Sequence, residues 1–323
     1  MYKILAAFLP LLAGFLLDCL IGDPYSLPHP IRLIGRTISS LERLLRKALP
    51  NYEYAAGVIL SCTVLIIFTA VPALILLLCY RLNIWAGIAA ESVMCFYLLA
   101  ARCLRDESMK VYRALCSENI EQARHAVSMI VGRDTKNLTD EGIAKAAVET
   151  VAENTSDGVT APMFYIMLGG ASAGFFYKAA NTMDSMLGYK NEKYIRFVRC
   201  SARLDDLLNF IPSRITALLM IVSAYILGMN GRRACSIWRR DRLNHASPNS
   251  AQTEAVCAGA LGVMLAGDAY YFGKLVKKKT IGDDLRPIRP EDIPAANRLM
   301  YCTAALMLVV ALSFRIMLFG VLL

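Results

Sequence analysis

The chain has 323 residues, of which 56% are hydrophobic, and its formal net charge is +9. The apolar content exceeds the roughly 45–50% usual for soluble domains, and together with a mean hydropathy of +0.45 it favours an integral membrane protein. The basic residues are spread over many segments, which argues against a nucleic-acid-binding protein. This charge is typical of cytoplasmic membrane segments and also suits anionic substrates.

Apolar runs in the first third of the chain predict membrane helices. Residues 4–17 lack a following small-residue cleavage motif, so we interpret them as an uncleaved first membrane helix. Residues 54–80 contain no charged side chain and exceed the roughly 20 residues that a span needs, with a bend expected at Pro72. Residues 84–101 form another candidate span, interrupted by Glu91. We interpret this glutamate as a helix-packing contact, with a functional intramembrane charge as the alternative.

The charged segments between these runs are predicted to be cytoplasmic. A structured, proline-rich turn region leads into residues 32–47, which we predict to be a loop with five basic residues and a single glutamate. Residues 102–158 read as amphipathic helices outside the bilayer. Within them, Val131-Gly132 predicts a helix stop, Thr139 predicts an N-cap, and the following helix is expected to end near Asn154.

The later apolar segments are less regular. Residues 159–177 are uncharged and glycine-rich, and both flanks look cytoplasmic, which favours a re-entrant or buried helical hairpin over a simple crossing. Residues 215–229 are apolar but short. Residues 255–273 are rich in Ala and Gly and are predicted to pack tightly against other helices. Residues 299–323 form a final span that carries Arg315.

The predicted fold is therefore an all-α polytopic membrane protein. It has about four or five transmembrane helices, with amphipathic helices packed at the cytoplasmic face. We predict one membrane-integrated catalytic unit made of N-terminal membrane helices 1–101, a cytoplasmic helical segment 102–158, site-bearing helices and loops 159–298, and a C-terminal membrane helix 299–323.

The ten cysteines and three histidines give no sign of a disulfide framework or a zinc site. No C-x-x-C pair occurs and several cysteines lie inside apolar runs, so we interpret them as buried free thiols. The histidines are far apart in the sequence and lack zinc-ligand spacing.

Carboxylates at helical spacing are the strongest sign of a site. Glu149 and Glu153 are four residues apart and share one helix face, and Asp157 follows in a T-S-D-G turn. Such a pair is ordinarily a solvated face. The alternative is a Mg²⁺ or amine site, because hard cations take oxygen ligands and bridge to phosphates.

Two further polar stripes follow within the next sixty residues of the chain. The second contains Asn181, Asp184 and Ser185, flanked by Lys178 and Lys190. The third contains Asp205, Asp206 and Asn209, with Arg203 and Arg214 nearby. Three such stripes beside apolar segments favour a functional site over separate solvated faces. The sequence contains no P-loop, dinucleotide-binding or nucleophile-elbow motif, which argues against those folds.

Several long motifs resemble the adenosylcobinamide-phosphate synthases of cobalamin biosynthesis. They are D-C-L-I-G-D-P with H-P-I-R-L-I-G (18–35), G-R-D-T (132–135), A-A-V-E-T-V-A-E-N-T-S-D-G-V-T-A-P (146–162), Y-K-A-A-N-T-M-D-S-M-L-G-Y-K (177–190), S-A-R-L-D-D-L-L-N-F-I-P-S-R (201–214), H-A-S-P-N (245–249) and A-G-A-L-G (258–262). The resemblance covers nearly the whole chain. One departure is Ser250-Ala251, where the family usually has a glycine after S-P-N.

The resemblance implies a multi-pass enzyme of the cytoplasmic (inner) membrane with its active site on the cytoplasmic side. The implied reaction is ATP-dependent amide formation between a propionate of adenosylcobyric acid and aminopropanol or its phosphate ester, through an acyl phosphate. ATP and Mg²⁺ are the implied cofactors, and the corrinoid cobalt belongs to the substrate. Expected partners are the corrinoid acid, the small amine, membrane lipid and later membrane enzymes of cobalamin assembly, and no nucleic acid.

With this reaction in view, we assign hypothetical roles to the polar residues. The catalytic set is Glu149, Glu153, Asp157, Asp184, Asp205 and Asp206, of which Glu149, Glu153 and Asp184 are the metal candidates. The ATP-binding set is Lys178, Asn181, Ser185, Lys190, Arg203, Asn209 and Arg214. The substrate-binding set is Asp23, His29, Arg133, Asp134, Asn154, His245 and Asn249.

The residues alone are also compatible with two other functional classes. A transporter or channel is suggested by the several spans and by Glu91 and Asp268, although no repeated half is visible. A non-catalytic membrane sensor with the same fold is the other. Amide formation coupled to ATP consumption separates the enzyme from both.

Overall fold

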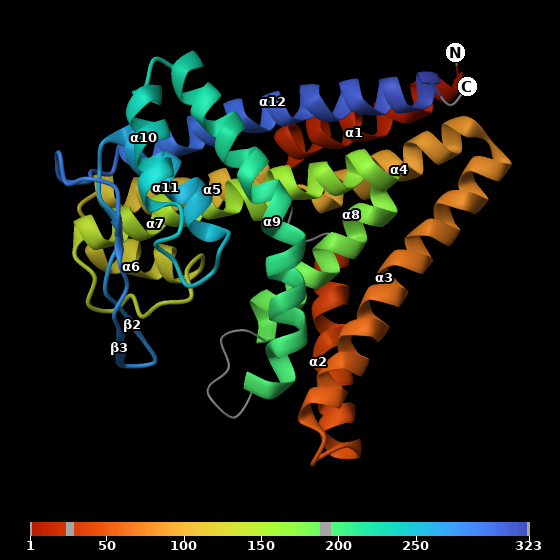
Figure 1. Ribbon diagram of the computed structural model, residues 1–323, viewed down its shortest axis with the longest axis horizontal. Coiled ribbons are helices and arrows are strands. Elements are labelled where there is room, and N and C mark those ends of the chain that lie inside the picture. The colour runs from red at the N-terminus through yellow and green to blue at the C-terminus, as the bar shows by residue number, and fades with distance from the viewer. Residues whose placement is uncertain (1, 24–28, 188–194, 322–323) are drawn as a thin grey trace. The chain divides into compact units, whose positions relative to one another are not determined.

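The computed structural model describes residues 2–23, 29–187 and 195–321, and these are mostly helical (Figure 1). The elements in chain order are α1 Tyr2–Ile21, α2 Pro30–Ala48, α3 Glu53–Leu82, α4 Ile84–Leu98, α5 Ala101–Cys116, α6 Ile120–Ser128, α7 Asp140–Asn154, the π-helical turn η1 Thr155–Thr160, α8 Ala161–Leu187, α9 Ile195–Ile226, α10 Gly231–Asp241, α11 Ser250–Leu261, β1 Leu265–Ala266, β2 Ala269–Tyr271, β3 Lys274–Val276, β4 Thr280–Ile281 and α12 Asp292–Val321.

The chain divides into two compact units. The described parts of residues 1–100, 161–208 and 308–323 form the first unit, and residues 101–160 and 209–307 form the second. Each of α9 and α12 therefore contributes to both units. The predicted boundaries at residues 101, 158 and 298 follow changes in composition along the chain, and they stay a prediction.

Six helical stretches within the described residues are long and apolar enough to cross a membrane. They are Ile4–Ile21, Glu53–Leu82, Ile84–Cys116, Asp140–Leu187, Phe197–Ile226 and Asp292–Leu318. The all-α polytopic prediction is confirmed, with six candidate spans instead of four or five. One reason for the difference is α9, which extends the short apolar run 215–229 toward its N-terminal side into a full-length helix.

The first unit has an apolar core built from four helices. Ile34 and Ile38 of α2, Leu60 of α3 and Met183 of α8 are fully buried in this cluster. The α3 backbone approaches α9 so closely that a Cβ at Gly57 would lie 2.0 Å from the carbonyl oxygen of Phe197, so only glycine fits there. The basic segment 32–47, predicted as a loop, is in fact helix α2. Its buried residues Ile34, Ile38 and Glu42 recur every fourth position and form one buried stripe, in which Glu42 pairs with Arg46 one turn later.

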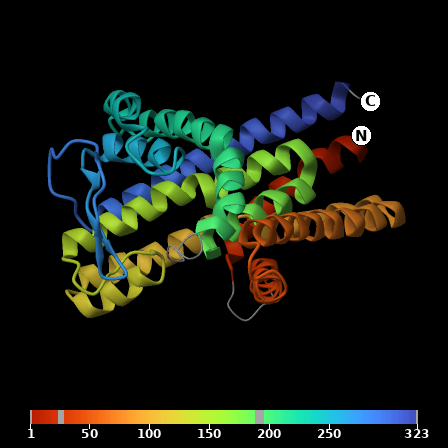
Figure 2. The same ribbon diagram turned by 60° about the horizontal axis from the view of Figure 1, so that its bottom comes forward.

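Helix α8 reverses direction in its middle (Figures 1 and 2). Gly169 and Gly170 leave the helical region, and Gly170 has a φ of 66°, which favours glycine. The rings of Tyr165 and Tyr177 stack at 5.0 Å. Twelve residues of straight helix would separate them by about 18 Å, so the two halves fold back on each other. The predicted re-entrant or buried hairpin at 159–177 is confirmed as a hairpin.

Two charged side chains hold the break in α8. Glu91 of α4 accepts a hydrogen bond from the Ala171 amide at 3.2 Å, at the start of the second half. Arg315 of α12 donates to the carbonyl oxygen of Ile166 at 2.5 Å, near the end of the first half. The other Glu91 oxygen accepts from the Tyr80 hydroxyl at 2.6 Å. The interpretation of Glu91 as a packing contact is therefore confirmed, because it satisfies backbone groups that the broken helix leaves open.

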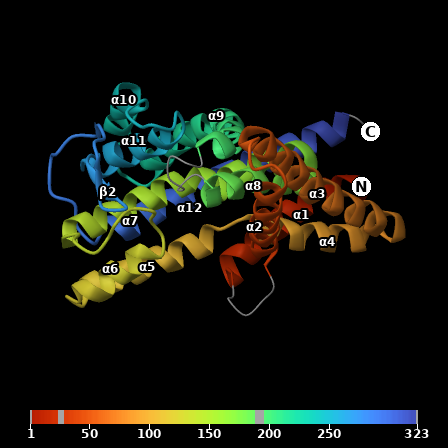
Figure 3. The ribbon, with the colours of Figure 1, turned by 90° about the horizontal axis from the view of Figure 1, so that it is seen from below.

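The second unit combines short helices with two antiparallel strand pairs. Helices α5 and α6 lie side by side (Figure 3), and α7 packs on α5, α6 and α11. Strand β1 pairs with β4, and β2 pairs with β3. The predicted tight packing of 255–273 against other helices is confirmed for its first part, because the α11 residues up to Ala260 are buried and α11 packs on α7 and α10. The rest of the stretch is not helical. Helix α11 ends at Gly262, whose φ of 72° is left-handed, and the chain then enters the strands.

The sequence predicted the caps and ends of helices more accurately. Thr139 caps α7 by accepting a hydrogen bond from the Gly142 amide, and α7 ends at Asn154 as expected. Helix α6 ends at Ser128, slightly before the predicted stop. The T-S-D-G segment is not a turn but the π-helical η1, in which the Thr160 hydroxyl bonds to the Thr155 carbonyl oxygen at 3.1 Å. All ten cysteines are free thiols. Of the five in apolar runs, Cys95 and Cys257 are buried as predicted, Cys79 and Cys302 are partly exposed, and Cys62 is exposed.

Candidate functional site

The two glutamates of α7 do not form a solvated face. Glu149 is only 4% exposed, because its helix is surrounded by packed alanines and valines on most sides. Glu153 is partly exposed one turn later. The ordinary interpretation of this pair as surface residues was therefore wrong for Glu149. A buried carboxylate is costly unless it is paired and hydrogen-bonded.

Glu149 is paired with Arg133 from the G-R-D-T loop. The two side chains form an ion pair, and the second Glu149 oxygen accepts a hydrogen bond from the Ala266 amide at 2.6 Å. Burial alone would lower the pKa of Arg133, but the charge and hydrogen bond of Glu149 raise it above its ordinary value. Arg133 therefore stays cationic beside the glutamate.

Glu153 and Glu254 extend this pair into an acidic group. The Ser250 hydroxyl donates to Glu153 at 2.7 Å, which joins α7 to the start of α11. Glu254 lies one turn further along α11 and is 5% exposed. Burial raises the pKa of Glu254 well above its ordinary value, and the negative charges of Glu149 and Glu153 raise it further. We call Glu149, Glu153 and Glu254 the acidic cluster.

Basic side chains accompany the acidic cluster. Burial lowers the pKa of His245, a shift that the charge of Glu153 opposes and the charge of Lys278 reinforces. At neutral pH this histidine is uncharged and able to accept a proton. Lys278 follows β3 and donates to the Tyr271 hydroxyl at 2.7 Å. Arg133, Lys278 and a neutral imidazole thus lie among three carboxylates.

The loop residue Asp134 has a structural role. Its carboxylate accepts a hydrogen bond from the Gly273 amide at 2.7 Å, and its own amide donates to the Tyr270 carbonyl oxygen at 2.9 Å. It therefore fastens the β2–β3 hairpin, which carries Tyr271 next to Lys278. Asp134 therefore supports the site, and its assignment to substrate binding stays a prediction.

Arg214 and Asn249 form a second contact in the same unit. The side-chain oxygen of Asn249 accepts from Arg214 at 3.2 Å and from the Ser213 hydroxyl at 3.3 Å. Arg214 also lies over the ring of Phe210, 3.6 Å from its centre. Asn209 is buried on the same helix. The P-S-R and S-P-N motifs are therefore brought together by the fold.

The polar stripes of α8 and α9 meet in the first unit. Asn181 donates to Asp205 at 3.3 Å, and Lys178 and Asp205 are both 8% exposed. The Ser185 hydroxyl is exposed and donates to the Asn181 carbonyl oxygen on its own helix. Asp184 and Asp206 are partly exposed and Arg203 is exposed. Two of the three predicted stripes thus share a contact, from Asn181 to Asp205.

The remaining predicted residues are placed as follows. His29 hydrogen-bonds Asp23 at 3.2 Å and caps α2 by accepting from the Ile31 amide, and the substrate-binding role of both residues stays a prediction. Asn154 donates back to Thr150 within α7, and Asp157 lies in η1. Lys190 lies outside the described residues. Asp184 belongs to the first unit and Glu149 to the second, so their joint role as metal ligands stays a prediction.

The acidic cluster fits a Mg²⁺–phosphate ligand better than a metal bound by protein alone. Among the described residues, no group of three His, Cys, Asp or Glu side chains is arranged to hold a metal ion. Mg²⁺ commonly uses only one or two carboxylates and completes its shell with water and phosphate oxygens. Glu153 and Glu254 can supply such a pair, because Glu149 is already engaged by Arg133 and a backbone amide.

Sequence reasoning missed Glu254, Lys278 and Ser250. A signal for Glu254 was present, since it is the single charge in the apolar run 250–267. A charge isolated in such a run is retained where it is paired or used. Lys278 had no local signal, because it is one of several consecutive lysines. Ser250 was noted only as a departure from the family pattern, yet its hydroxyl binds Glu153.

Comparisons with known proteins agree with this arrangement of motifs. The family model described as "CobD/Cbib protein" matches residues 11–300. A Clostridium perfringens protein is 45% identical over 94% of this chain and 97% of its own length, and one from Pelobacter propionicus is 47% identical over 95% of each. A Listeria monocytogenes protein is 43% identical over 95% of this chain and 98% of its own. Each is named "Cobalamin biosynthesis protein CobD". No solved structure matches the chain.

Proposed function

Because this chain belongs to the CobD/CbiB family of cobalamin biosynthesis proteins, we propose that it forms an amide bond in that pathway at the expense of ATP. The electrophile is a propionate of adenosylcobyric acid, and the nucleophile is (R)-1-aminopropan-2-ol or its O-phosphate. The observation that carries this proposal is the acidic cluster with Arg133, Lys278 and His245 beside it. Phosphoryl and acyl transfer both need this combination of charges.

The first step activates a poor electrophile. The substrate carboxylate oxygen attacks the γ-phosphorus of ATP, the bond to the β-phosphate oxygen breaks, and an acyl phosphate and ADP result. Glu153 and Glu254 would hold Mg²⁺, which would neutralise charge at the phosphates when bound. Lys278 and Arg133 are the nearby cations for the negative charge that develops on the phosphoryl oxygens.

The second step forms the amide. The amine nitrogen attacks the acyl carbon, the bond from that carbon to the phosphate oxygen breaks, and phosphate leaves. The nitrogen must lose a proton in this step. His245 is suited to accept it, because burial keeps its imidazole neutral at physiological pH. Glu153, which lies near His245, stabilises the imidazolium that results.

We also propose a ligand-binding role for polar residues of the first unit. Lys178, Asn181 and Asp205 form a partly buried polar group on α8 and α9, suited to phosphate or corrinoid amides. The proposal also places the protein in the cytoplasmic membrane with its site facing the cytoplasm, where ATP is available. Its six apolar helical stretches support a multi-pass membrane protein.

The test is an amide-forming assay with purified full-length protein in nanodiscs. Adenosylcobyric acid, the amine and ATP are supplied, and amide product and ADP are measured together by mass spectrometry. We expect Glu153→Gln to lower the rate roughly 100-fold or more, within the range for loss of a catalytic carboxylate. Glu141→Gln is the matched control, because Glu141 is exposed in the first turn of the same helix.

The alternatives give different results in the same preparation. A transporter moves solute into vesicles without amide product, and a sensor binds corrinoid without consuming ATP. Either result from wild-type protein would exclude the proposed ligase. A wild-type rate in Glu153→Gln would instead remove this residue from the site.

A further inference from the structure

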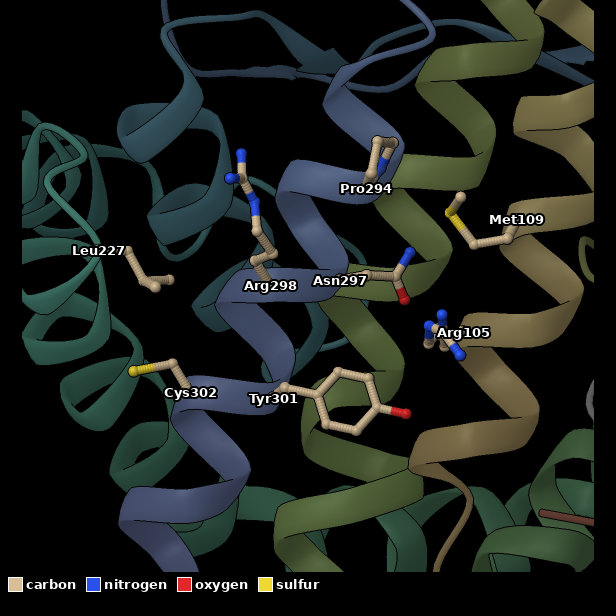
Figure 4. A pocket seen from close by; sticks show the side chains of 8 residues that line it. All are labelled: Arg105, Met109, Leu227, Pro294, Asn297, Arg298, Tyr301 and Cys302. Atoms are coloured by element: carbon tan, nitrogen blue, oxygen red, sulfur yellow. The ribbon is translucent and has the colours of Figure 1, made fainter. Parts of the chain in front are cut away.

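A cavity in the second unit has no part in the proposed reaction. It has a volume of about 620 Å³ and lies along α12, beside α5 and the end of α9 (Figure 4). Two arginines, an asparagine and a tyrosine line it together with apolar side chains. The lining residues are Arg105, Met109, Leu227, Pro294, Asn297, Arg298, Tyr301 and Cys302.

Asn297 is the polar group of the cavity with an unused acceptor. It is only 4% exposed, and its amide nitrogen donates to the Ser108 hydroxyl and to the Ile293 carbonyl oxygen, both at 2.9 Å. These bonds fix the orientation of the amide. Its side-chain oxygen has no hydrogen-bond partner among the described residues. A buried acceptor left open is costly and indicates that a donor is missing. Figure 4 shows this amide pointing from α12 toward Arg105 and Met109 of α5.

The two arginines give the cavity a positive charge. Arg298 is exposed and forms no ion pair within the described part of the chain. Arg105 is 44% exposed and shares only a 3.4 Å contact with Asp106. Guanidinium groups bind phosphate oxygens with two parallel hydrogen bonds. The cavity therefore combines two donors for a phosphate with one acceptor for a hydroxyl or ammonium group.

The sequence places this cavity at the edge of the apolar layer. Arg298 immediately precedes the uncharged run 299–314, and Arg105 follows the uncharged run 92–101 by one turn. Leu227 lies near the end of the uncharged run 215–231. All three elements thus change from apolar to charged at the cavity. Phospholipid headgroups lie at this depth, and interfacial arginines commonly contact them.

We propose that this cavity binds the headgroup of an anionic membrane phospholipid, with its phosphodiester on the exposed Arg298 and a headgroup hydroxyl on Asn297. Arg105, on the other side of Asn297 (Figure 4), adds positive charge. The shared chemistry is a phosphate beside a hydrogen-bond donor, which a soluble phosphate ester also offers. The apolar side chains of Met109, Leu227 and Cys302 favour the lipid, since they match the start of an acyl chain. The charge of the cavity favours phosphatidylglycerol over phosphatidylcholine, because Asp106 is already paired with Arg102 at 2.7 Å and leaves Arg105 and Arg298 as net positive charges.

The test is native mass spectrometry of the full-length protein in detergent, with phosphatidylglycerol or phosphatidylcholine added. We expect wild-type protein to retain phosphatidylglycerol in preference to phosphatidylcholine. Arg298→Gln should weaken that retention roughly tenfold, as for the loss of one charge-assisted contact. Arg289→Gln is the control, because Arg289 is exposed just before α12 and does not line the cavity.

A second arm distinguishes lipid from soluble phosphate. Glycerol 3-phosphate carries the same phosphate and hydroxyl groups without acyl chains, and it should not displace phosphatidylglycerol. Asn297→Leu should also lose the preference between the two lipids, and its unfolding temperature reports whether it has folded. The proposal is overturned when the two lipids bind equally to wild-type protein, when Arg298→Gln binds like wild type, or when glycerol 3-phosphate displaces the lipid.

Discussion

Each of the two units contains a buried glutamate–arginine pair, and the pairs differ in what surrounds them. In the first unit, both Glu91 oxygens accept hydrogen bonds, and Arg315 donates to two backbone carbonyl oxygens. In the second unit, the Glu149–Arg133 pair lies close to two more glutamates. Glu254 is nearly fully buried and forms no hydrogen bond with any residue that the structure describes.

We interpret the Glu91–Arg315 pair as charges that stabilise the fold, and the acidic cluster as charges that would bind the proposed ligand. A buried ion pair is tolerated when its remaining hydrogen-bonding groups are satisfied, as they are at the break in α8. A buried carboxylate beside two others lowers stability and is retained where it has another use. Removal of a charge should therefore lower the free energy of unfolding at the Glu91–Arg315 pair and raise it at the acidic cluster.

Removal of Arg315 should have the largest effect. Arg315→Leu leaves Glu91 without its positive partner and the Ile166 carbonyl oxygen without a donor. We expect a loss of about 3–5 kcal/mol in the free energy of unfolding, as for other broken buried pairs. Thermal unfolding in detergent measures this loss, with Arg232→Leu on the exposed face of α10 as the control. An unfolding temperature equal to that of the control would show that the pair does not hold the hairpin.

Removal of the Glu254 charge should stabilise the protein. Glu254→Gln removes a buried charge and its repulsion from Glu149 and Glu153, for a gain of roughly 0.5–2 kcal/mol. The gain should grow with pH. The pKa of Glu254 is raised above its ordinary value of 4.5, so the folded wild-type protein loses stability as the pH rises from 4.5 through the raised pKa.

The same measurement supplies the outcome that contradicts this prediction. Unfolding temperatures of wild type and Glu254→Gln are compared between about pH 5 and pH 8, where the unfolded-state glutamate is ionised. A difference that stays constant or shrinks as the pH rises would mean that Glu254 is not held against its neighbours' charge. Gln252→Glu is unsuitable as a control because that side chain is buried and hydrogen-bonded to Trp238. Glu291→Gln is the control variant, because Glu291 is exposed.

Replacement of His245 should change the free energy of unfolding less than the two substitutions above, and the change should depend on pH. Its pKa is lowered in the folded protein, so the unfolded chain takes up a proton first as the pH falls through about 6.5. Wild-type stability should therefore decline below that pH, and His245→Gln should decline less. The proposed proton acceptor should also stay active down to about pH 6.5, which a pH profile of amide formation measures. A profile that falls already above pH 7 would contradict the lowered pKa.

Asp134 should have the smallest effect. Asp134→Asn weakens one hydrogen bond to the Gly273 amide at the edge of the site, at a cost of about 0.5 kcal/mol. We expect near-normal stability and a modest rise in KM, because the hairpin carrying Tyr271 becomes less fixed. Asn retains an acceptor, so Asp134→Ala should have the larger effect of the two. Equal and severe loss of activity in both variants would instead indicate direct contact with substrate.

Sequence patterns predicted the features that depend on neighbours along the chain. The end of α7 at Asn154, its cap at Thr139 and the shared face of Glu149 and Glu153 follow from helical spacing. The hairpin in α8 followed from glycines in an uncharged segment between charged flanks. The mistakes concern residues whose state is set by distant segments. Glu149 looked like a surface residue because Arg133 and Ala266, which bury and pair it, lie elsewhere in the chain.

Residues 255–273 show a second kind of limit. An Ala- and Gly-rich apolar run fits a packed helix and a set of short buried strands equally well. The choice is made by Gly262 and Gly267, whose positive φ angles end the helix and turn the chain into the strand pairs. Composition does not reveal those angles. Glu254, the third member of the acidic cluster, lies directly before this run, and the sequence analysis did not assign it to the site.

Amide formation by purified Glu254→Gln tests the central claim most directly. Wild-type protein should yield product only with ATP and both substrates present. The variant should fold with an unfolding temperature at least equal to that of wild type, yet form product roughly 100-fold more slowly, because it lacks a carboxylate for Mg²⁺. Product formed at the wild-type rate by this variant would show that the acidic cluster is not the site of the reaction.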